Sequence, residues 1–368
     1  MRHAPAWAHQ PLYYTLRAAA AALQVFPIDQ NLRTLRGLGG LYAEAPFSRR
    51  RLGRAIENLR WCFPSWPEER VRRYAVDSYR RLFGLAIEVA STPRLITDDS
   101  WPEFVRLGEM GPMLRRLLDN AVSGGRPCVF ITGHCGNWEL LGYTLAALGF
   151  PMHALYRPLD LAPLDRWVRE TRERRGLRLL DKFGALEQAP ALMERGEHVA
   201  FIADQNAGDR GVFVPFFGRL ASTYKSIGLL AMRFDAPVVC GQARAVGDWG
   251  RLGAGAPPID AHRFRYEIDV VDVIRPADWA AQPDPLFYIT ARYRRAIETM
   301  VKRAPEQYLW MHRYWKSRPP HEREGRPFPS RLREKLASLP WMTGRELDRI
   351  VVRSESDSAA WAAERGRR

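Results

Sequence analysis

Short apolar runs alternate with amphipathic helical patterns through the middle of the chain, and this alternation constrains the fold more than any other feature. Runs typical of strands fall at residues 128–133, 152–156, 177–180, 198–203, 237–244 and 266–274. A chain of this kind folds into a sheet covered by helices, with its sites at the carboxyl ends of strands. His134, Arg157 and Asp204 each follow such a run directly. We therefore predict an α/β fold whose site includes these three residues.

The two ends of the chain have different patterns. The segment Ser65–Glu68 combines a serine, a proline and a glutamate suited to a helix start, and a helical stripe then continues toward Val89. We expect residues 1–100 to form an N-terminal helical region and residues 101–320 the α/β domain. Residues 321–368 read as a charged, partly flexible extension.

Residues 11–26 are mostly apolar and include five consecutive alanines. No run of 18 apolar residues occurs in the chain, and the segment lacks the layout of a signal peptide. Two interpretations stay open: an ordinary buried helix, or a helix lying in a membrane surface. In the second, Arg33, Arg36 and Arg49 to Arg51 meet lipid headgroups.

The formal net charge of +15 indicates an anionic partner. Nucleic acid, an anionic membrane surface and an acidic carrier protein all qualify. The chain holds four cysteines, at positions 62, 128, 135 and 240, without a C-x-x-C pair. We expect reduced thiols on the cytosolic side of a membrane and no structural metal.

The segment from Pro127 to Leu141 carries the first catalytic candidates. Its strand ends beside His134, and Glu139 follows five positions later at the start of a helical pattern. A carboxylate in the first turn of that helix can reach back to the imidazole and raise its basicity. This spacing predicts a general base that removes a proton from an incoming hydroxyl group. The neighbouring Cys135 fits a small buried hydrophobe better than a nucleophile.

Two further blocks add polar groups to aromatic segments. Residues 203–219 deliver Asp204 and Gln205 from a strand end, followed by a glycine loop and a phenylalanine-rich segment that can line an acyl-chain groove. In the next residues, Ser222 or Thr223 can cap the helix expected over 222–234. Residues 305–319 interleave aromatic and basic side chains.

These blocks together resemble a known family. The segment Gly-His-Cys-Gly-Asn-Trp-Glu at 133–139 is similar to the H-x-x-x-x-E signature of the bacterial lipid A late acyltransferases, the lauroyl and myristoyl transferases of the glycerolipid acyltransferase superfamily. The blocks at 203–223 and 305–319 resemble that family's later motifs in the same order, and the resemblance spans about residues 10–320.

The resemblance implies a mixed β-sheet covered by helices on both faces. It also implies an O-acyltransferase that moves a fatty acyl chain from acyl carrier protein to a hydroxyl of a lipid A precursor, at the cytoplasmic face of the inner membrane, without metal or cofactor. The catalytic residues carried over are His134, Glu139, Arg172 as the oxyanion partner and Asp204. The substrate-binding residues carried over are Asn137, Trp138, Arg157, Gln205, Gly208, Phe216, Phe217, Arg219, His312 and Arg313.

Other functions remain open at this point. The acceptor can be another lipid, such as a lysophospholipid or a phosphatidylinositol mannoside. Tyr224 and Lys225 stand where the family pattern has a small residue, which leaves the acyl-chain length undecided. A basic nucleic-acid-binding protein is the alternative of a different class, because interleaved aromatic and basic residues also grip single strands. That alternative gives no role to His134 with Glu139, so we expect no nucleic-acid partner.

Overall fold

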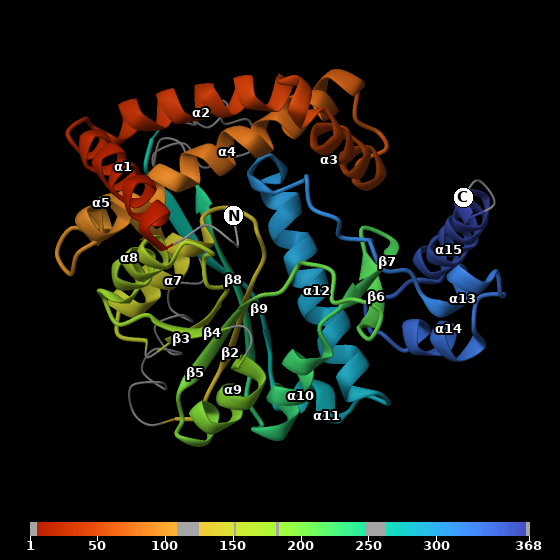
Figure 1. Cartoon of the computed structure of the whole chain (residues 1–368). Helices are drawn as coiled ribbons and strands as arrows, with labels where there is room; N and C mark the ends of the chain where they lie inside the picture. The colour runs from red at the N-terminus through yellow and green to blue at the C-terminus, as the bar shows by residue number, and fades with distance from the viewer. Residues whose placement is uncertain (1–5, 109–124, 151, 182–183, 247–262, 366–368) are drawn as a thin grey trace.

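The computed structural model describes residues 6–108, 125–150, 152–181, 184–246 and 263–365. Its centre, within these residues, is a seven-stranded sheet in the order β1-β9-β8-β2-β5-β3-β4 (Figure 1). The strands are β1 (Val105–Leu107), β2 (Val129–Thr132), β3 (Met152–Tyr156), β4 (Arg178–Asp181), β5 (His198–Ile202), β8 (Val238–Ala245) and β9 (Tyr266–Ile274). Adjacent strands are parallel except β8 and β9, so the sheet is mixed. The six predicted runs match strands to within one residue at each end.

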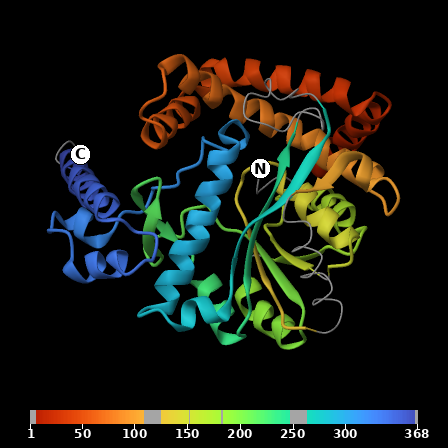
Figure 2. The same ribbon diagram turned by 180° about the vertical axis from the view of Figure 1, so that it is seen from behind.

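Helices cover both faces of the sheet, which confirms the predicted α/β class. The alternation along β2 explains the two layers, because Val129 and Ile131 belong to one core cluster and Phe130 to the other. The first cluster includes α9 (Ala185–Glu194), α10 (Lys225–Arg233) and α12 (Pro285–Arg303). On the other face lie α7 (Trp138–Ala147) and α8 (Ala162–Glu173), and Figure 2 shows the molecule from behind. Two short helices, α5 (Trp101–Phe104) and α11 (Pro276–Ala280), precede β1 and α12.

An N-terminal helical layer lies across one end of the sheet in both views (Figures 1 and 2). It comprises α1 (Ala6–Gln24), α2 (Ile28–Glu44), the 3-10 turn η1 (Pro46–Ser48), α3 (Arg49–Cys62) and α4 (Glu68–Leu95). Helices α2 and α4 cross closely, because a Cβ at Gly39 would lie 2.8 Å from the Tyr79 carbonyl oxygen. Among the described residues, no helix is both long and apolar enough to cross a bilayer.

The crossing of α2 and α4 corrects one expectation about the basic residues. Arg36 is only 2 % exposed, and its Nη2 lies 2.8 Å from Glu88 Oε1 on α4. A side chain at Gly84 would collide with the Arg36 guanidinium, so the glycine makes room for it. Arg36 therefore cannot meet lipid headgroups, whereas Arg33 and the run 49–51 are exposed.

The phenylalanine-rich segment forms an antiparallel hairpin of β6 (Val212–Phe216) and β7 (Arg219–Thr223). Its two-residue loop, Phe217 and Gly218, has φ of 52° and 69°, the conformation of a tight hairpin turn. The predicted helix start at Ser222 is wrong by three residues. Neither Ser222 nor Thr223 caps α10, because both lie in a strand that ends only one residue before the helix cap at Tyr224.

The C-terminal segment is helical as far as residue 365 and packs beside the hairpin (Figure 1), which differs from the partly flexible extension expected. Its helices are α13 (Pro320–Glu324), α14 (Ser330–Ala337) and α15 (Gly344–Arg365). Arg318, 3 % exposed, donates to the Leu220 carbonyl at 2.8 Å and to Asp357 on α15 at 2.7 Å. Glu322 accepts from the same guanidinium at 2.7 Å, so a buried ionic network anchors the segment.

Candidate active site

The register of two central strands places His134 beside Asp204. Strand β2 pairs with β5 in parallel, and Thr132 lies opposite Ile202. Residues two positions beyond these ends therefore meet at the carboxyl edge of the sheet. His134 Nδ1 lies 2.7 Å from Asp204 Oδ1, and the His134 backbone N–H donates to Asp204 Oδ2 at 3.0 Å. One carboxylate thus holds both the ring and the main chain of His134.

The main chain of other segments also holds the turn after His134. Gly136 has a φ of 68°, and a Cβ there would lie 2.0 Å from the Ala243 carbonyl oxygen, so only glycine fits. Its N–H donates to the Gln307 carbonyl at 3.0 Å, and Leu309 N–H donates to the His134 carbonyl at 3.2 Å. The turn is therefore fixed by the main chain of the segment around the 3-10 turn η2 (Pro305–Gln307).

Asp204 is fully buried yet remains an anion. Burial raises the pKa of this carboxyl, but the His134 imidazole, the two hydrogen bonds from His134 and the Arg294 guanidinium outweigh burial and lower it to about 2. Arg294 on α12 is also buried; it donates to the Asp204 carbonyl at 2.6 Å and lies 3.9 Å from the centre of the Phe216 ring. An anionic acceptor at Nδ1 keeps the proton there and leaves His134 Nε2 as the basic nitrogen.

The carboxylate beside the imidazole is thus Asp204, which differs from the expectation for Glu139. Glu139 is the second residue of α7, as expected, but its carboxylate forms an ion pair with Arg172 on α8. The physical reason is the strand register, because Asp204 reaches the ring from the next strand at the same level. Asn137, which lies between His134 and Glu139 in the chain, accepts from Leu140 N–H and caps α7.

A cavity of about 940 Å³ opens at His134. Its polar wall holds His134, Glu139, Arg157, Arg172 and Gln205. Its apolar wall comes from α4, α8, α10 and the strands and includes Leu85, Val89, Leu155, Trp167, Phe201, Tyr224 and Ile227. Helix α4 of the N-terminal layer therefore completes a site that begins at the carboxyl ends of β2, β3 and β5.

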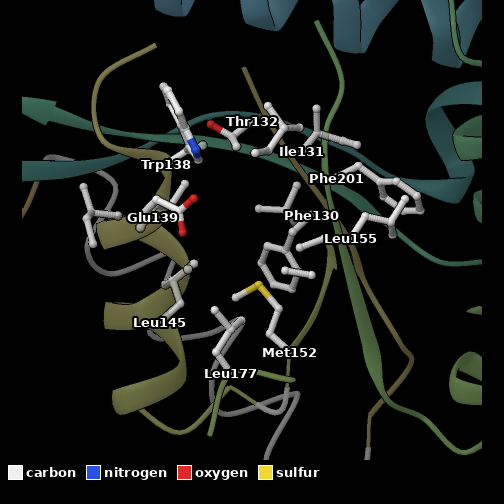
Figure 3. A pocket seen from close by; sticks show the side chains of 18 of the residues that line it. Phe130, Ile131, Thr132, Trp138, Glu139, Leu145, Met152, Leu155, Leu177 and Phe201 are labelled. Carbon is white, nitrogen blue, oxygen red and sulfur yellow. The ribbon is translucent and has the colours of Figure 1, made fainter. Parts of the chain in front are cut away.

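A narrower cavity of about 90 Å³ lies between α7 and the sheet. Figure 3 shows its lining, in which Glu139 and Leu145 from α7 face Phe130 and Met152 across the space. Its wall is almost wholly apolar apart from Thr132, Glu139, Arg172 and Asp269. The two cavities share lining residues, including Trp138, Glu139 and Arg172. The pair of Glu139 and Arg172 therefore stands where the wide cavity meets the narrow apolar one.

Several candidate substrate-binding residues lie together at this site. Trp138, Arg157 and Gln205 line the large cavity. The Trp138 ring meets the His134 ring edge-on with centres 4.9 Å apart, and Gln205 Nε2 lies 3.5 Å from His134 Nε2. The His312 ring is 5.2 Å from that of His134, and burial together with His134 lowers the His312 pKa.

Other candidates lie away from the cavities. Phe216 is fully buried, and Phe217 packs edge-on against Phe63 and Trp310, so these two rings pack in or against the core and neither lines a cavity at His134. Gly208, with a φ of 80°, shapes the loop before the hairpin.

The remaining basic and polar candidates have structural partners or lie on the surface. Arg219 pairs with Asp357 at 2.7 Å and lies 4.3 Å from the Trp61 ring centre. Asn137 is 2 % exposed and serves as the helix cap, and Arg313 is exposed on the protein surface. None of these three lines either cavity at the site.

Sequence reasoning missed Arg294 and the walls supplied by α4 and α8. A signal for Arg294 was present, since it shares the buried stripe of α12 with Thr290 and Ile297, where a basic residue is out of place. The walls had no such signal. Leu85, Val89 and Trp167 read as ordinary packing positions, and only the tertiary arrangement brings them to His134.

The described residues contain no group of three or more histidine, cysteine or acidic side chains placed to hold a metal ion. The four cysteines are free. Burial raises the pKa of the Cys135 thiol, and the nearby Asp204 raises it further. A thiol of that kind is a poor nucleophile, so the acid–base chemistry of the site rests on His134.

Residues 8–317 match the family model described as bacterial lipid A biosynthesis acyltransferase. The chain is 25% identical over 266 residues to a lipid A biosynthesis acyltransferase of Haemophilus influenzae, which covers 70% of this chain and 73% of the relative. It is 26% identical over 277 residues to the lipid A biosynthesis palmitoleoyltransferase of Escherichia coli, covering 74% and 81% of the two chains. To the lipid A biosynthesis lauroyltransferase of the same organism it is 26% identical over 287 residues, covering 77% and 84%. Because the family model spans most of the chain, this protein belongs to the bacterial lipid A biosynthesis acyltransferase family.

Proposed function

We propose that this protein transfers a fatty acyl chain from an acyl carrier protein thioester to a hydroxyl of a lipid A precursor. The observation that carries the proposal is the pairing of His134 with the buried Asp204 anion at the polar end of a large, otherwise apolar cavity. Burial and Asp204 raise the pKa of the neighbouring Cys135 thiol and make it a poor nucleophile, so the base suits direct attack by a substrate hydroxyl.

The proposed reaction needs one proton acceptor. His134 Nε2 takes the hydroxyl proton as the acceptor oxygen attacks the thioester carbonyl carbon. The tetrahedral intermediate then collapses, the carbon–sulfur bond breaks, and the departing thiolate of the carrier takes the proton from His134. Asp204 stabilises the imidazolium formed in between, and contributions of this kind are on the order of a hundredfold or more in rate.

Arg172 supplies a positive charge on the cavity wall in this proposal. Its side chain is 18% exposed, lines both cavities and is held by Glu139. We assign Arg172 the role of stabilising the negative charge that develops on the thioester oxygen. Glu139 orients the Arg172 guanidinium for this role. Arg157, at the end of β3 on the same cavity wall, is the proposed partner of an acceptor phosphate.

The apolar surfaces suit the two lipid substrates. The narrow cavity under α7 is the proposed place for the end of the acyl chain, because it is apolar and begins beside Glu139. At the wide cavity, Leu82 and Leu159 line the wall and are also exposed, at 38% and 40%. Such an apolar rim lets a lipid acceptor enter without crossing a polar surface.

The N-terminal layer is the proposed membrane-binding face. Val25, Phe26, Leu41 and Phe47 are exposed large hydrophobic residues, at 80%, 49%, 73% and 71%. The exposed arginines at 49–51 follow them directly in the chain. Apolar groups beside arginines favour a peripheral position on an anionic bilayer, which we place at the cytoplasmic side of the inner membrane. The net charge of +15 also suits the acidic carrier.

The proposal is tested by incubating purified protein with acyl carrier protein that carries a radiolabelled acyl chain and with a lipid A precursor in vesicles. Label should move to the glycolipid, and a His134→Ala variant should transfer it at least a hundredfold more slowly. Parallel reactions with lysophospholipid and with phosphatidylinositol mannoside decide the acceptor. Equal rates for the parent and the alanine variant would remove His134 as the base. Tight, salt-dependent binding of single-stranded nucleic acid without acyl transfer would favour the alternative class.

A further inference from the structure

A buried carboxylate links the N-terminal layer to the catalytic turn. Glu88 on α4 is 3 % exposed. Its Oε1 accepts from Arg36 Nη2 on α2, and its Oε2 accepts from Asn137 Nδ2, both at 2.8 Å. Three elements far apart in the sequence therefore meet at one charged group.

Asn137 has a second contact that fixes the direction of its amide. Its Oδ1 accepts from Leu140 N–H at 2.8 Å and caps α7, so its Nδ2 must point to Glu88. The Asn137 main chain donates to the Ala243 carbonyl at 2.8 Å. This residue lies three positions after His134 and two before Glu139. Any shift of Asn137 therefore moves the proposed base and the carboxylate that holds Arg172.

An isolated carboxylate in such a place is costly, so its partners matter. Burying an ionised group without partners is strongly unfavourable, and removing one partner of a buried pair leaves the remaining charge uncompensated. Glu88 has a cation on one oxygen and an amide donor on the other. An apolar residue could fill the same space, yet it could not hold the Asn137 side chain in one orientation.

We propose that Glu88 is a positioning residue for acyl transfer, which orients the turn from His134 to Glu139 through Asn137. This inference rests on the proposed function, because it assigns Glu88 to the same reaction. It also makes the N-terminal layer part of the active site, since Arg36 on α2 and Glu88 on α4 hold the turn at Asn137, whereas Asp204 holds it at His134.

A charge exchange tests the proposal. Glu88→Gln turns one carboxylate oxygen into an amide nitrogen that faces either Arg36 or the Asn137 amide nitrogen. Asn137→Asp places a second carboxylate against Glu88. The double variant restores the pattern, because the introduced glutamine can donate to the introduced aspartate, which still caps α7 and keeps one negative charge near Arg36. We expect each single variant to lose at least tenfold in kcat with KM changed less than threefold, and the double variant to recover to within threefold of the parent.

Asn137→Ser keeps the proposal testable if the charged variants do not fold. A serine still caps α7 but cannot reach Glu88, so kcat should fall at least fivefold. Glu88 keeps its ion pair with Arg36, so the protein should still fold, with a lower melting temperature because one buried hydrogen bond is lost. Hydrogen exchange at residues 133–141 should become faster in this variant, with no change at the β6–β7 hairpin. Glu44→Gln, which alters an exposed ion pair between α2 and Arg72 on α4, is the matched control and should keep parental rates.

Two outcomes overturn the proposal. The first is Asn137→Ser with parental kcat and parental exchange over residues 133–141. The second is a double variant that folds as stably as the parent but transfers no faster than the single variants. Failure of the parent protein to transfer acyl chains would refute the proposed function instead, and the exchange measurement would still decide whether Glu88 orders the turn.

Discussion

Replacing Asp204 with asparagine should reduce acyl transfer far more than its small change in shape suggests. The two oxygens of Asp204 accept separately from the His134 ring and from the His134 backbone N–H. Asparagine offers one oxygen. If that oxygen stays on the backbone, the amide nitrogen donates to Nδ1 and forces the ring proton onto Nε2, where the base must accept. If it stays on the ring, the amide nitrogen meets the backbone N–H in a fully buried site.

The size of the effect follows from these contacts. A buried donor left without an acceptor costs roughly 1–3 kcal/mol. The lowering of the Asp204 pKa from 3.8 to about 2 corresponds to roughly 2 kcal/mol of net stabilisation of the anion, to which the contacts with His134 and Arg294 contribute. Together these terms predict a loss of about a thousandfold in kcat. A related loss, about ten-thousandfold, is known for the equivalent change in serine proteases.

The assay is the initial rate of transfer at saturating acyl donor and acceptor, with folding checked by circular dichroism and melting temperature. Glu139→Gln is the informative comparison. Its carboxamide oxygen can still accept from Arg172, so we expect a loss of about tenfold or less. A folded Asp204→Asn variant that keeps more than a tenth of the parental kcat would refute the assignment. If Glu139→Gln were the slower of the two, Glu139 would be the carboxylate that tunes the base.

Three further outcomes follow from individual sites. Gly142→Leu should fill the narrow cavity that its helix borders and shift the preferred donor to shorter acyl chains, as competition between donors of different length measures. Gly136→Ala should lower the melting temperature strongly, because its Cβ would overlap the Ala243 carbonyl, and an unchanged melting curve would contradict the turn geometry. Burial lowers the pKa of His198 to about 4. As pH drops from 6.5 to 4, the unfolded chain therefore binds a proton at this histidine before the folded chain does. This uptake should lower the free energy of unfolding by roughly 2–3 kcal/mol. His198→Asn, whose oxygen can still accept from Cys128 N–H, should flatten that dependence in denaturant titrations at several pH values.

The sequence was sufficient for the strands because each is a short apolar run with turn residues at its ends. The runs at 152–156 and 266–274 match β3 and β9 at both ends. The hairpin of β6 and β7 was harder to find. Its loop requires Phe217 at positive φ, which is rare for an aromatic residue, so the local sequence does not predict a turn there.

The partners of charged groups were the least predictable part of the site. Glu139 is near His134 in sequence, but Asp204 reaches it through a strand pairing across 70 positions. Arg36 looked like an exposed basic residue because its partner, Glu88, lies on a different helix. Local spacing limits which residues can meet, and only the packing of the sheet and helices selects among them.

Lipid A composition in living cells tests the central claim most directly. The protein would be expressed in a bacterium that lacks one late acyltransferase, and its lipid A measured by mass spectrometry. We expect a new species heavier by one acyl chain with the parent protein, and none with His134→Ala expressed at the same level. Unchanged lipid A with the parent protein, or the same new species with both proteins, would contradict the account.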